Sequence, residues 1–209
     1  RRASVPRKMP RPSNTTERRA QIIEGLLDVI AADGYEGATI ASIAKAAGLG
    51  SGLVHYHFSS KQAILLALIE RIGELIEVRY QRRLAPAGDD PVARLRAFID
   101  AHLALGDDAE PRAVAAWVVV GAEALRQPAV GEVYRQVVAA RLTTLEGLAS
   151  DVLRARAGHA RGAKEAAAGI MAAIEGAYQL AAAAPSAMPR GRGARVVERM
   201  ALGLLDGES

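Results

Sequence analysis

Apolar residues recur every three or four positions along most of the chain, and turn-forming residues separate the periodic stretches. This spacing is typical of amphipathic helices, so each stretch predicts one helix. The run Trp117 to Val120 is the nearest candidate for a strand, but its alanine-rich flanks favour a helix. The pattern predicts an all-α protein with helices at about 15–33, 39–47, 51–56, 61–84, 92–105, 112–126, 129–157, 163–183 and 195–206.

Turn residues set the expected helix ends. Thr15 or Thr16 can cap the first helix, and Asp33-Gly34 is expected to end it. Gly48 is expected to end the second helix. The segment Ala85 to Pro91 contains two prolines and a polar cluster, so we expect it to separate the long helix at 61–84 from the helices that follow.

The charge of the chain is distributed unevenly. The formal net charge is +4, yet residues 1–14 carry five basic side chains and no acidic one, while residues 66–209 carry 18 of each sign. A basic arm beside a small domain is the electrostatic pattern of nucleic-acid binding. It is equally the pattern of a solvated, disordered tail. We expect a disordered basic arm at 1–14, a small domain at 15–60 and a larger one at 61–209.

Composition narrows the classes of function. The chain has no cysteine, so it has no disulfide and no thiolate metal site, which suits a cytoplasmic protein. No secretory signal follows the basic start. The segment Ala166 to Ala184 approaches the length of a membrane span, but it is mostly alanine and contains Glu175, so we expect a buried helix contact. No Ser-His-Asp, Glu-x-x-His, P-loop or dinucleotide motif is present, and we therefore expect no enzyme, cofactor or metal.

The segment Thr39 to Lys61 reads TIASIAKAAGLGSGLVHYHFSSK and predicts a helix-turn-helix. Gly48-Leu49-Gly50 supplies the tight turn. The second helix of such a motif enters the major groove, so its outward residues have to be small or polar. Val54 and Phe58 are expected to point inward, and the outward residues are Ser51, Gly52, Leu53, His55 and Tyr56.

This segment resembles the DNA-binding region of TetR-family regulators, which typically reads T-x-x-x-I-A-x-x-A-G-x-S-x-G-x-x-Y-x-H-F-x-x-K. The chain departs from the pattern at Gly50, where the family often has Ser, and at His55, where Tyr is common. With the first and fourth helices, the resemblance covers residues 15–84. The matching positions are Thr39, Ile43, Ala44, Ala47, Gly48, Gly52, Tyr56 (one position from the usual Tyr), His57, Phe58 and Lys61.

The resemblance implies that the second helix reads DNA. Ser51, Leu53 and His55 would face the groove floor, with Leu53 against a thymine methyl group. Tyr56 and His57 would bond phosphates. Two alternatives remain: the Tyr56 ring packs in the core, or the two histidines form a metal pair. The second alternative lacks a further ligand nearby, and residues two apart on a helix face different ways.

Four further DNA contacts follow from the same resemblance. Thr39 would offer its hydroxyl and the neighbouring backbone N–H to a phosphate. Gly52 would let the backbone approach DNA closely. Lys61 would add a positive charge at the start of the fourth helix. The basic arm would lie in the adjacent minor groove.

The region from about residue 85 onward resembles, more loosely, the C-terminal part of the BetI-like branch of the family. The resemblance rests on Trp117 to Leu125, Pro128, Tyr134-Arg135 and Ala173 to Leu180. It implies dimerisation and a site for a small effector. The helices expected at 129–157 and 163–183 carry small residues, which permit two helices to cross closely. Such a crossing occurs either in a four-helix dimer interface or within one subunit. The small residues are Gly169, Ala173, Gly176, Ala177 and Ala181.

The candidate effector site consists of scarce aromatic residues and carboxylates. An aromatic cluster with a carboxylate suits a cationic ligand, although aromatics on an apolar face are more often core, and the two glutamates are more often paired with Arg. With one Trp in the chain, choline-like recognition is not supported. The candidates are Phe98, His102, Trp117, Glu123, Tyr134 and Tyr178, with Tyr80 and Glu175 beside them.

Taken together, these patterns predict a homodimeric repressor that binds a pseudo-palindromic operator on double-stranded DNA. One short recognition helix reads few base pairs, so two copies are needed. A small-molecule effector of unidentified structure would release the DNA, with the helix at 61–84 as the lever. The alternatives are a ligand-independent activator, an architectural DNA-binding protein, an all-α enzyme and a helical protein-interaction module.

Overall fold

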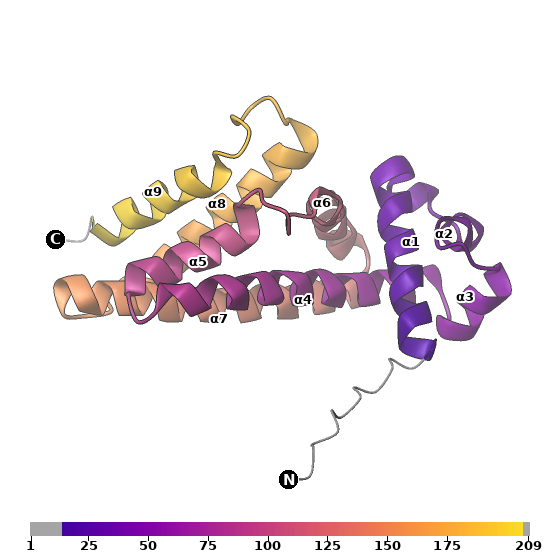
Figure 1. The fold of residues 1–209 in the computed structure, drawn as a ribbon, viewed down its shortest axis with the longest axis horizontal. Coiled ribbons are helices and arrows are strands. Elements are labelled where there is room, and N and C mark those ends of the chain that lie inside the picture. The colour runs from indigo at the N-terminus through magenta and orange to yellow at the C-terminus, as the bar shows by residue number, and fades with distance from the viewer. Residues whose placement is uncertain (1–13, 207–209) are drawn as a thin grey trace, which may run out of the picture. The chain divides into compact units, whose positions relative to one another are not determined.

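The computed structural model describes residues 14–206, and the predicted basic arm at 1–14 lies outside the described residues except for Asn14. Every regular element in the described range is an α-helix, which confirms the all-α prediction (Figure 1). The helices are α1 (Asn14–Gly37), α2 (Ile40–Ala46), α3 (Ser51–His57), α4 (Lys61–Ala87), α5 (Pro91–Leu103), α6 (Pro111–Arg126), α7 (Pro128–Ala157), α8 (Ala163–Ala183) and α9 (Gly193–Asp206).

The described residues form two compact units, which divide between Ile64 and Leu65. The division falls within the first turn of α4, a few residues after the boundary at 60 that the sequence suggests. We refer to the two parts as the N-terminal unit and the C-terminal unit.

The N-terminal unit is built on α1, which contacts both α2 and α3. Its core side chains include Ile22, Leu26, Ile43 and Val54, all of them fully buried. The helices α1 and α2 cross closely at Gly25, where a Cβ atom would stand 2.8 Å from the carbonyl oxygen of Ile43. Only a residue without a side chain fits this crossing.

Local signals define the helix ends in this unit. Thr39 caps α2 in a reciprocal capping box with Ser42. Gly48, at φ +65°, takes the left-handed conformation that the turn requires. Gly34 breaks the helical dihedrals of α1 as expected, but helical turns continue to Gly37, so the prediction that Asp33-Gly34 ends the helix was only partly correct.

The helix α4 is longer than its sequence predicts. It continues through Pro86 to Ala87 rather than ending at Leu84. Gly88, at φ +59°, then takes the left-handed conformation, and Asp90 caps α5 with Pro91 in its first turn. The prolines therefore mark positions near helix ends, and the connection is shorter than expected.

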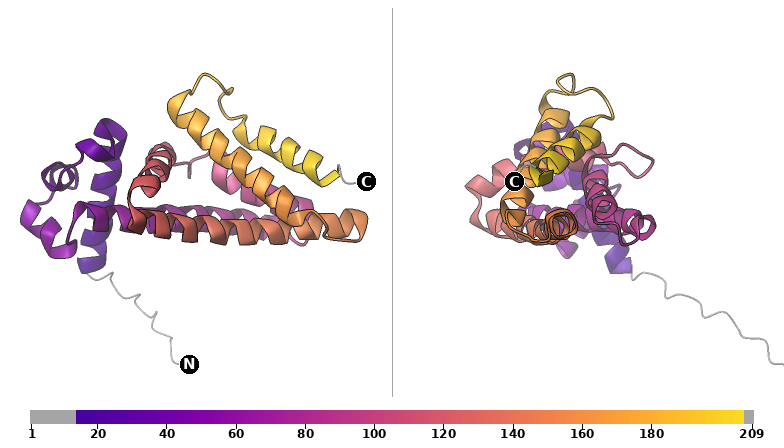
Figure 2. Two further views of the ribbon diagram at one scale, coloured as in Figure 1. Left: turned by 180° about the vertical axis from the view of Figure 1, so that it is seen from behind. Right: turned by 90° about the vertical axis from the view of Figure 1, so that its left-hand side faces the viewer.

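The C-terminal unit is a bundle in which α8 contacts α5, α6, α7 and α9. Figures 1 and 2 show α9 beside α8. By length and composition alone, α8 is the one helix in the described range apolar enough to cross a membrane. Ile170, Ile174 and Tyr178 of α8 are buried among the neighbouring helices, in agreement with the helix contact expected from the sequence.

Candidate functional site

The helix α3 presents the outward face that its sequence predicts. Val54 is fully buried, whereas Ser51, Gly52 and His55 are exposed. The Leu53 side chain is 36% exposed, so an apolar group stands on this face beside polar ones. This combination of small, polar and apolar groups is what reading base edges in a major groove requires.

Tyr56 lies on the same face and is not a core residue. Its side chain is 79% exposed, which rules out the alternative that the ring fills the core. The ring meets His57 edge-on, with 5.0 Å between ring centroids. Among residues 14–206, no group of three or more His, Asp or Glu side chains is placed to hold a metal ion.

Two side chains of α1 fix α2 and α3 in place. The Arg19 guanidinium donates to the carbonyl oxygen of His57 at 2.7 Å and lies over the Phe58 ring, 4.0 Å from its centroid. Gln21 donates to the carbonyl oxygen of Ala47 at 2.6 Å. Both bonds satisfy carbonyls at helix C-termini that have no partner within their helix, so the motif is rigidly positioned.

Lys61 has internal partners that the sequence did not suggest. Its ammonium group donates to the carbonyl oxygens of Tyr35 and Ala38, each at 2.9 Å. It also lies 4.3 Å from the centroid of the Tyr35 ring. Lys61 therefore positions the segment before α2, where Thr39 stands exposed at the helix start.

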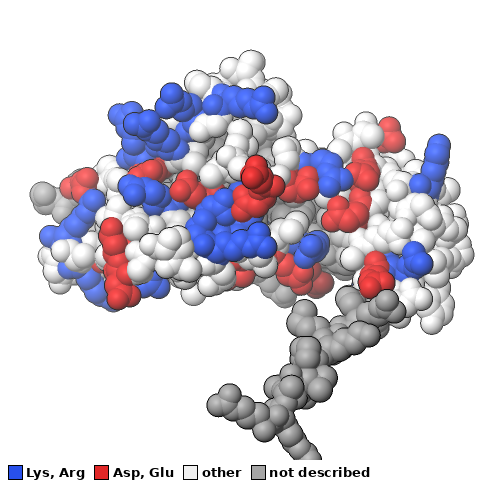
Figure 3. Space-filling model, in the orientation of Figure 1, with Lys and Arg blue, Asp and Glu red and all other residues white. Residues whose placement is uncertain are grey.

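The segment that contains α2 and α3 differs in charge from the rest of the chain. No Asp or Glu occurs between Glu36 and Glu70, a stretch that includes all of α2 and α3. A surface without carboxylates avoids repulsion of the DNA backbone. On the C-terminal unit, Figure 3 shows Lys and Arg interspersed with Asp and Glu.

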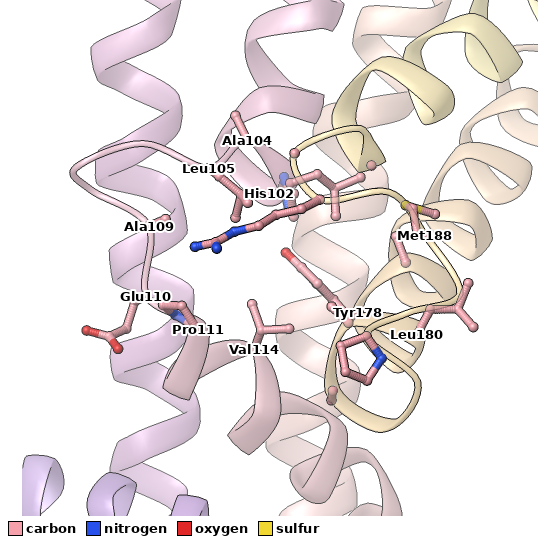
Figure 4. A pocket seen from close by; sticks show the side chains of 18 of the residues that line it. His102, Ala104, Leu105, Ala109, Glu110, Pro111, Val114, Tyr178, Leu180 and Met188 are labelled. Atoms are coloured by element: carbon pink, nitrogen blue, oxygen red, sulfur yellow. The ribbon is translucent and has the colours of Figure 1, made fainter.

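Three cavities, of about 450, 440 and 340 Å³, lie in the C-terminal unit, and His102 lines all of them. Volumes of this size suit small organic ligands. Figure 4 shows the first cavity, into which Tyr178 points its hydroxyl group, with Leu105, Val114 and Met188 around it.

The structure brings together most of the residues predicted for an effector site. The rings of Tyr80, Phe98, His102 and Tyr178 follow one another, with centroid separations of 5.4, 4.4 and 6.5 Å. A second pair, Trp117 and Tyr134, stacks at 4.8 Å. The Trp117 indole N–H donates to both carboxylate oxygens of Glu175, at 2.9 and 3.1 Å.

Glu123 is set apart from this cluster. It is buried near the junction of α6 and α7, where it accepts hydrogen bonds from Arg126 at 2.5 Å and Gln127 at 2.6 Å. It is not among the residues that line the three cavities. Glu123 is therefore paired with an arginine, which is the alternative to ligand binding that the sequence analysis gave for the glutamates.

Burial changes the pKa values of the ionisable side chains in this cluster. Burial, followed by repulsion from Arg141, lowers the pKa of His102 to about 3, so the ring is neutral. Its Nδ1–H then donates to the carbonyl oxygen of Phe98 at 2.9 Å. Burial also raises the pKa of Glu175 above its ordinary value, and raises the pKa of Tyr178.

Sequence reasoning missed two arginines of this site. Arg141 is buried, with its guanidinium 4.3 Å from the centroid of the Trp117 ring. Arg79 donates to the carbonyl oxygen of Ala104 at 2.8 Å and lines two of the cavities. For Arg141 the sequence contains one indication of burial, because it lies four residues before the buried Leu145 and therefore on the same face of the helix.

Comparison with known proteins identifies both units. The family model described as bacterial regulatory proteins, tetR family, matches residues 22–68. The model described as BetI-type transcriptional repressor, C-terminal, matches residues 91–206. These two models span the predicted helix-turn-helix and most of the C-terminal unit.

Individual relatives agree with the family models. A BetI transcriptional regulator of Burkholderia mallei is 32% identical over 174 residues, which is 81% of this chain and 84% of that protein. A BetI regulator of Stenotrophomonas maltophilia is 34% identical over 129 residues, covering 61% of this chain and 64% of its own length. Both are described as regulators and not as enzymes.

Solved structures share the fold. A transcriptional regulator of Rhodococcus sp. Rha1 has a TM-score of 0.78 at 24% identity and covers 90% of this chain and 96% of its own. A regulator of Saccharomonospora viridis, solved in complex with choline, has a TM-score of 0.74 at 23% identity and covers 92% of this chain and 97% of its own.

A helix-turn-helix with an exposed second helix, followed by a helical unit with internal cavities, defines a DNA-binding transcriptional regulator. The chain belongs to the TetR family of bacterial regulatory proteins. Its C-terminal unit places it in the BetI-type branch of that family.

Proposed function

We propose that this protein is a homodimeric repressor that binds a pseudo-palindromic operator and releases it when a small effector enters the C-terminal unit. The observation that carries the proposal is the exposed face of α3, which has no carboxylate and is held by internal bonds from α1. In this proposal Ser51, Leu53 and His55 contact bases.

The remaining residues of the face bind the DNA backbone. Tyr56 and His57 bond phosphates, and Thr39 offers the N-terminal end of α2 to a third phosphate. Gly52 allows close approach, since no atom lies within 4 Å of the position where its Cβ would stand. Lys61 adds positive charge and holds the segment that carries Thr39.

Dimerisation supplies the second recognition helix, about 34–36 Å from the first along the operator. Of the small residues proposed for the interface, Ala177 is buried within the unit, and a Cβ at Gly169 would stand 3.2 Å from Leu204. These two positions serve packing within the subunit. The exposed small residues on α8, Ala168, Ala172 and Gly176, are the surface we propose for the partner subunit.

Effector control requires two states of the dimer with different spacing of the recognition helices. An effector that binds the splayed state better releases DNA, and DNA must then weaken effector binding by the same factor. The helix α4 belongs to both units and is the element we propose to transmit the change. Equal effector affinities with and without operator would exclude this coupling.

The test uses the purified protein and DNA from upstream of its own gene. Fluorescence anisotropy measures their binding at two salt concentrations. Saturable binding that weakens with salt and prefers a pseudo-palindrome over scrambled DNA is expected. The Tyr56→Phe variant should bind both DNAs about 5-fold more weakly, because it loses one phosphate hydrogen bond. His159→Gln, at an exposed residue of the C-terminal unit outside the cavities, is the control.

The variant Leu53→Ala separates base reading from backbone binding. It should reduce the preference for the operator over scrambled DNA while leaving the salt dependence unchanged. Absence of DNA binding even at low salt would refute the proposal and favour the protein-interaction module.

A further inference from the structure

Four polar atoms of the C-terminal unit are buried without a hydrogen-bond partner and belong to one cluster. They are the two terminal nitrogens of Arg141, Nε2 of His102 and the hydroxyl oxygen of Tyr178. Buried polar atoms are nearly always paired, so a concentration of unpaired ones at cavity walls indicates a missing partner.

Arg141 is the most informative of the three residues. Its side chain is 93% buried, as its residual exposure is 7%. No ion pair joins it to a carboxylate in the described part of the chain, although Glu175 is close enough to influence its titration. A buried guanidinium without a hydrogen-bonded anion is unfavourable, so an anion that bonds directly to Arg141 would be stabilised there.

Glu175 forms no hydrogen bond with the terminal nitrogens of Arg141. Its carboxylate accepts the Trp117 indole N–H, and burial raises its pKa above the ordinary value. Tyr178 supplies no anion, because burial raises the pKa of its hydroxyl and keeps it protonated. Tyr178 is therefore a donor, like Arg141.

His102 connects the two groups of donors, because it lines both the cavity of about 450 Å³ and the cavity of about 440 Å³. Arg141 lines the second of these and Tyr178 the first. The neutral His102 ring uses Nδ1–H on the carbonyl oxygen of Phe98, so its Nε2 is left as an acceptor. The site thus offers three donor positions and one acceptor.

The space beyond these donors is apolar. The larger cavity is lined by Leu105, Val114, Leu180 and Met188, and by several alanines and prolines. An occupant that fills this cavity needs a hydrocarbon portion to match its apolar lining.

We propose that the effector is an amphipathic carboxylic acid, whose carboxylate accepts hydrogen bonds from Arg141 and Tyr178 and whose apolar portion fills the larger cavity. A hydroxyl group beside the carboxylate would donate to His102 Nε2. This inference rests on the proposed role of the C-terminal unit as the effector-binding unit. It assigns the chemical class that this unit selects.

The same geometry disfavours a cation such as choline. The Arg141 guanidinium already lies over the face of Trp117, the only Trp in the chain. A cationic ligand would lose that aromatic face and would be repelled by Arg141. Choline in the Saccharomonospora viridis relative therefore does not predict choline here.

Trp117 provides the test, because its fluorescence comes from beneath Arg141. The purified full chain, without DNA, is titrated with straight-chain acids from butanoate to decanoate, with 3-hydroxyoctanoate, and with octanol and choline as uncharged and cationic probes. Saturable fluorescence changes and a raised Tm are expected for the longer acids and not for choline. Octanol should bind at least about 10-fold more weakly than octanoate, because it lacks the charge-assisted bonds.

Two variants test whether Arg141 and Tyr178 bind the carboxylate. Arg141→Met should weaken octanoate binding by about 10- to 100-fold, while the Tm of the unliganded protein stays the same or rises because an uncompensated charge is removed. Tyr178→Phe should also weaken binding without lowering that Tm. Arg135→Met, on the exposed face of the same helix, is the matched control.

The outcomes are decisive for the ligand class and independent of DNA binding. Tighter binding of choline than of any acid, no saturable response to any acid of the series, or unchanged acid affinity in Arg141→Met would overturn the inference. A lower Tm in unliganded Arg141→Met would show that the arginine stabilises the fold and would overturn it too. Failure of the operator experiment alone would refute the repressor proposal and leave acid binding intact.

Discussion

The two units differ in how the polar side chains beside their functional surfaces are partnered. In the N-terminal unit, the half-buried Arg19, Gln21 and Lys61 each donate to backbone carbonyls at helix or segment ends. In the C-terminal unit, Arg141 and His102 are buried with unpartnered nitrogens beside cavities. A satisfied network fixes one arrangement, whereas an unsatisfied one leaves free energy to be gained by a ligand. The first unit is suited to present a rigid surface and the second to respond to a small molecule.

The largest expected effect tests the rigidity of the N-terminal unit. In Gly25→Ala, the added Cβ would meet the Ile43 carbonyl oxygen at 2.8 Å and the Ala47 backbone nitrogen at 2.9 Å. Because backbone atoms cannot move aside as a flexible side chain does, α1 and α2 must separate. We expect a loss of about 3 kcal/mol in the free energy of unfolding, measured by urea denaturation.

A glycine without neighbours is the control for this prediction. Gly147, on the exposed side of α7, has no atom within 4 Å of its Cβ position. Gly147→Ala should leave stability unchanged or raise it by up to about 1 kcal/mol, through helix propensity. Equal stability of Gly25→Ala and the wild type would contradict the close crossing of α1 and α2.

A smaller effect is expected in the C-terminal unit, where the pH dependence of stability tests the burial of His102. Burial, and then Arg141, lowers the pKa of His102 from 6.5 to about 3, and Arg79 contributes in the same direction. The unfolded chain therefore binds a proton at pH values where the folded chain does not, so stability falls as the pH drops below 6.5. Between about pH 7.5 and about pH 5, the wild type should lose about 2 kcal/mol more than His102→Gln.

Urea denaturation of both proteins at the two pH values measures this difference. His159→Gln, at an exposed histidine, should retain the pH dependence of the wild type. Parallel pH profiles for wild type and His102→Gln would show that His102 titrates normally and is not buried as described.

The smallest effect tests the start of α3. Gly50 is the N-cap of this helix and provides no side-chain hydrogen bond. Its φ of −78° and ψ of 145° suit any residue, and no atom lies near its Cβ position. Gly50→Ser should raise stability by a few tenths of a kcal/mol, because the serine hydroxyl accepts a backbone N–H of the first turn.

The variant Gly50→Ala tests whether the serine hydroxyl is responsible for this gain in stability. Gly50→Ala adds a Cβ without an acceptor and should lower stability relative to Gly50→Ser by about 1 kcal/mol. Equal midpoints for the two variants in urea denaturation would show that the hydroxyl does not cap the helix.

The amino-acid sequence was sufficient for the all-α class, for the order of the helices and for the outward face of α3. Helical periodicity and turn residues are local signals, and residues 39–61 carry both at fixed spacing. The helix end near Pro86 was less well predicted, because a proline close to a helix end does not stop the last turn. At Gly34 the helical dihedrals break as predicted, and only the short helical turn that follows to Gly37 was not predicted.

The tertiary structure alone decided which side chains meet. Arginine is usually exposed, and the position of Arg141 on the buried stripe of α7 did not indicate that its guanidinium lies over the Trp117 ring of α6. Glu123 and Glu175 look alike in the sequence, yet Glu123 is paired with Arg126 beside its own helix end, and Glu175 accepts a hydrogen bond from the Trp117 indole. Periodicity determines which face of a helix is buried, but the charge left unpaired in a cavity depends on contacts between residues far apart in the chain.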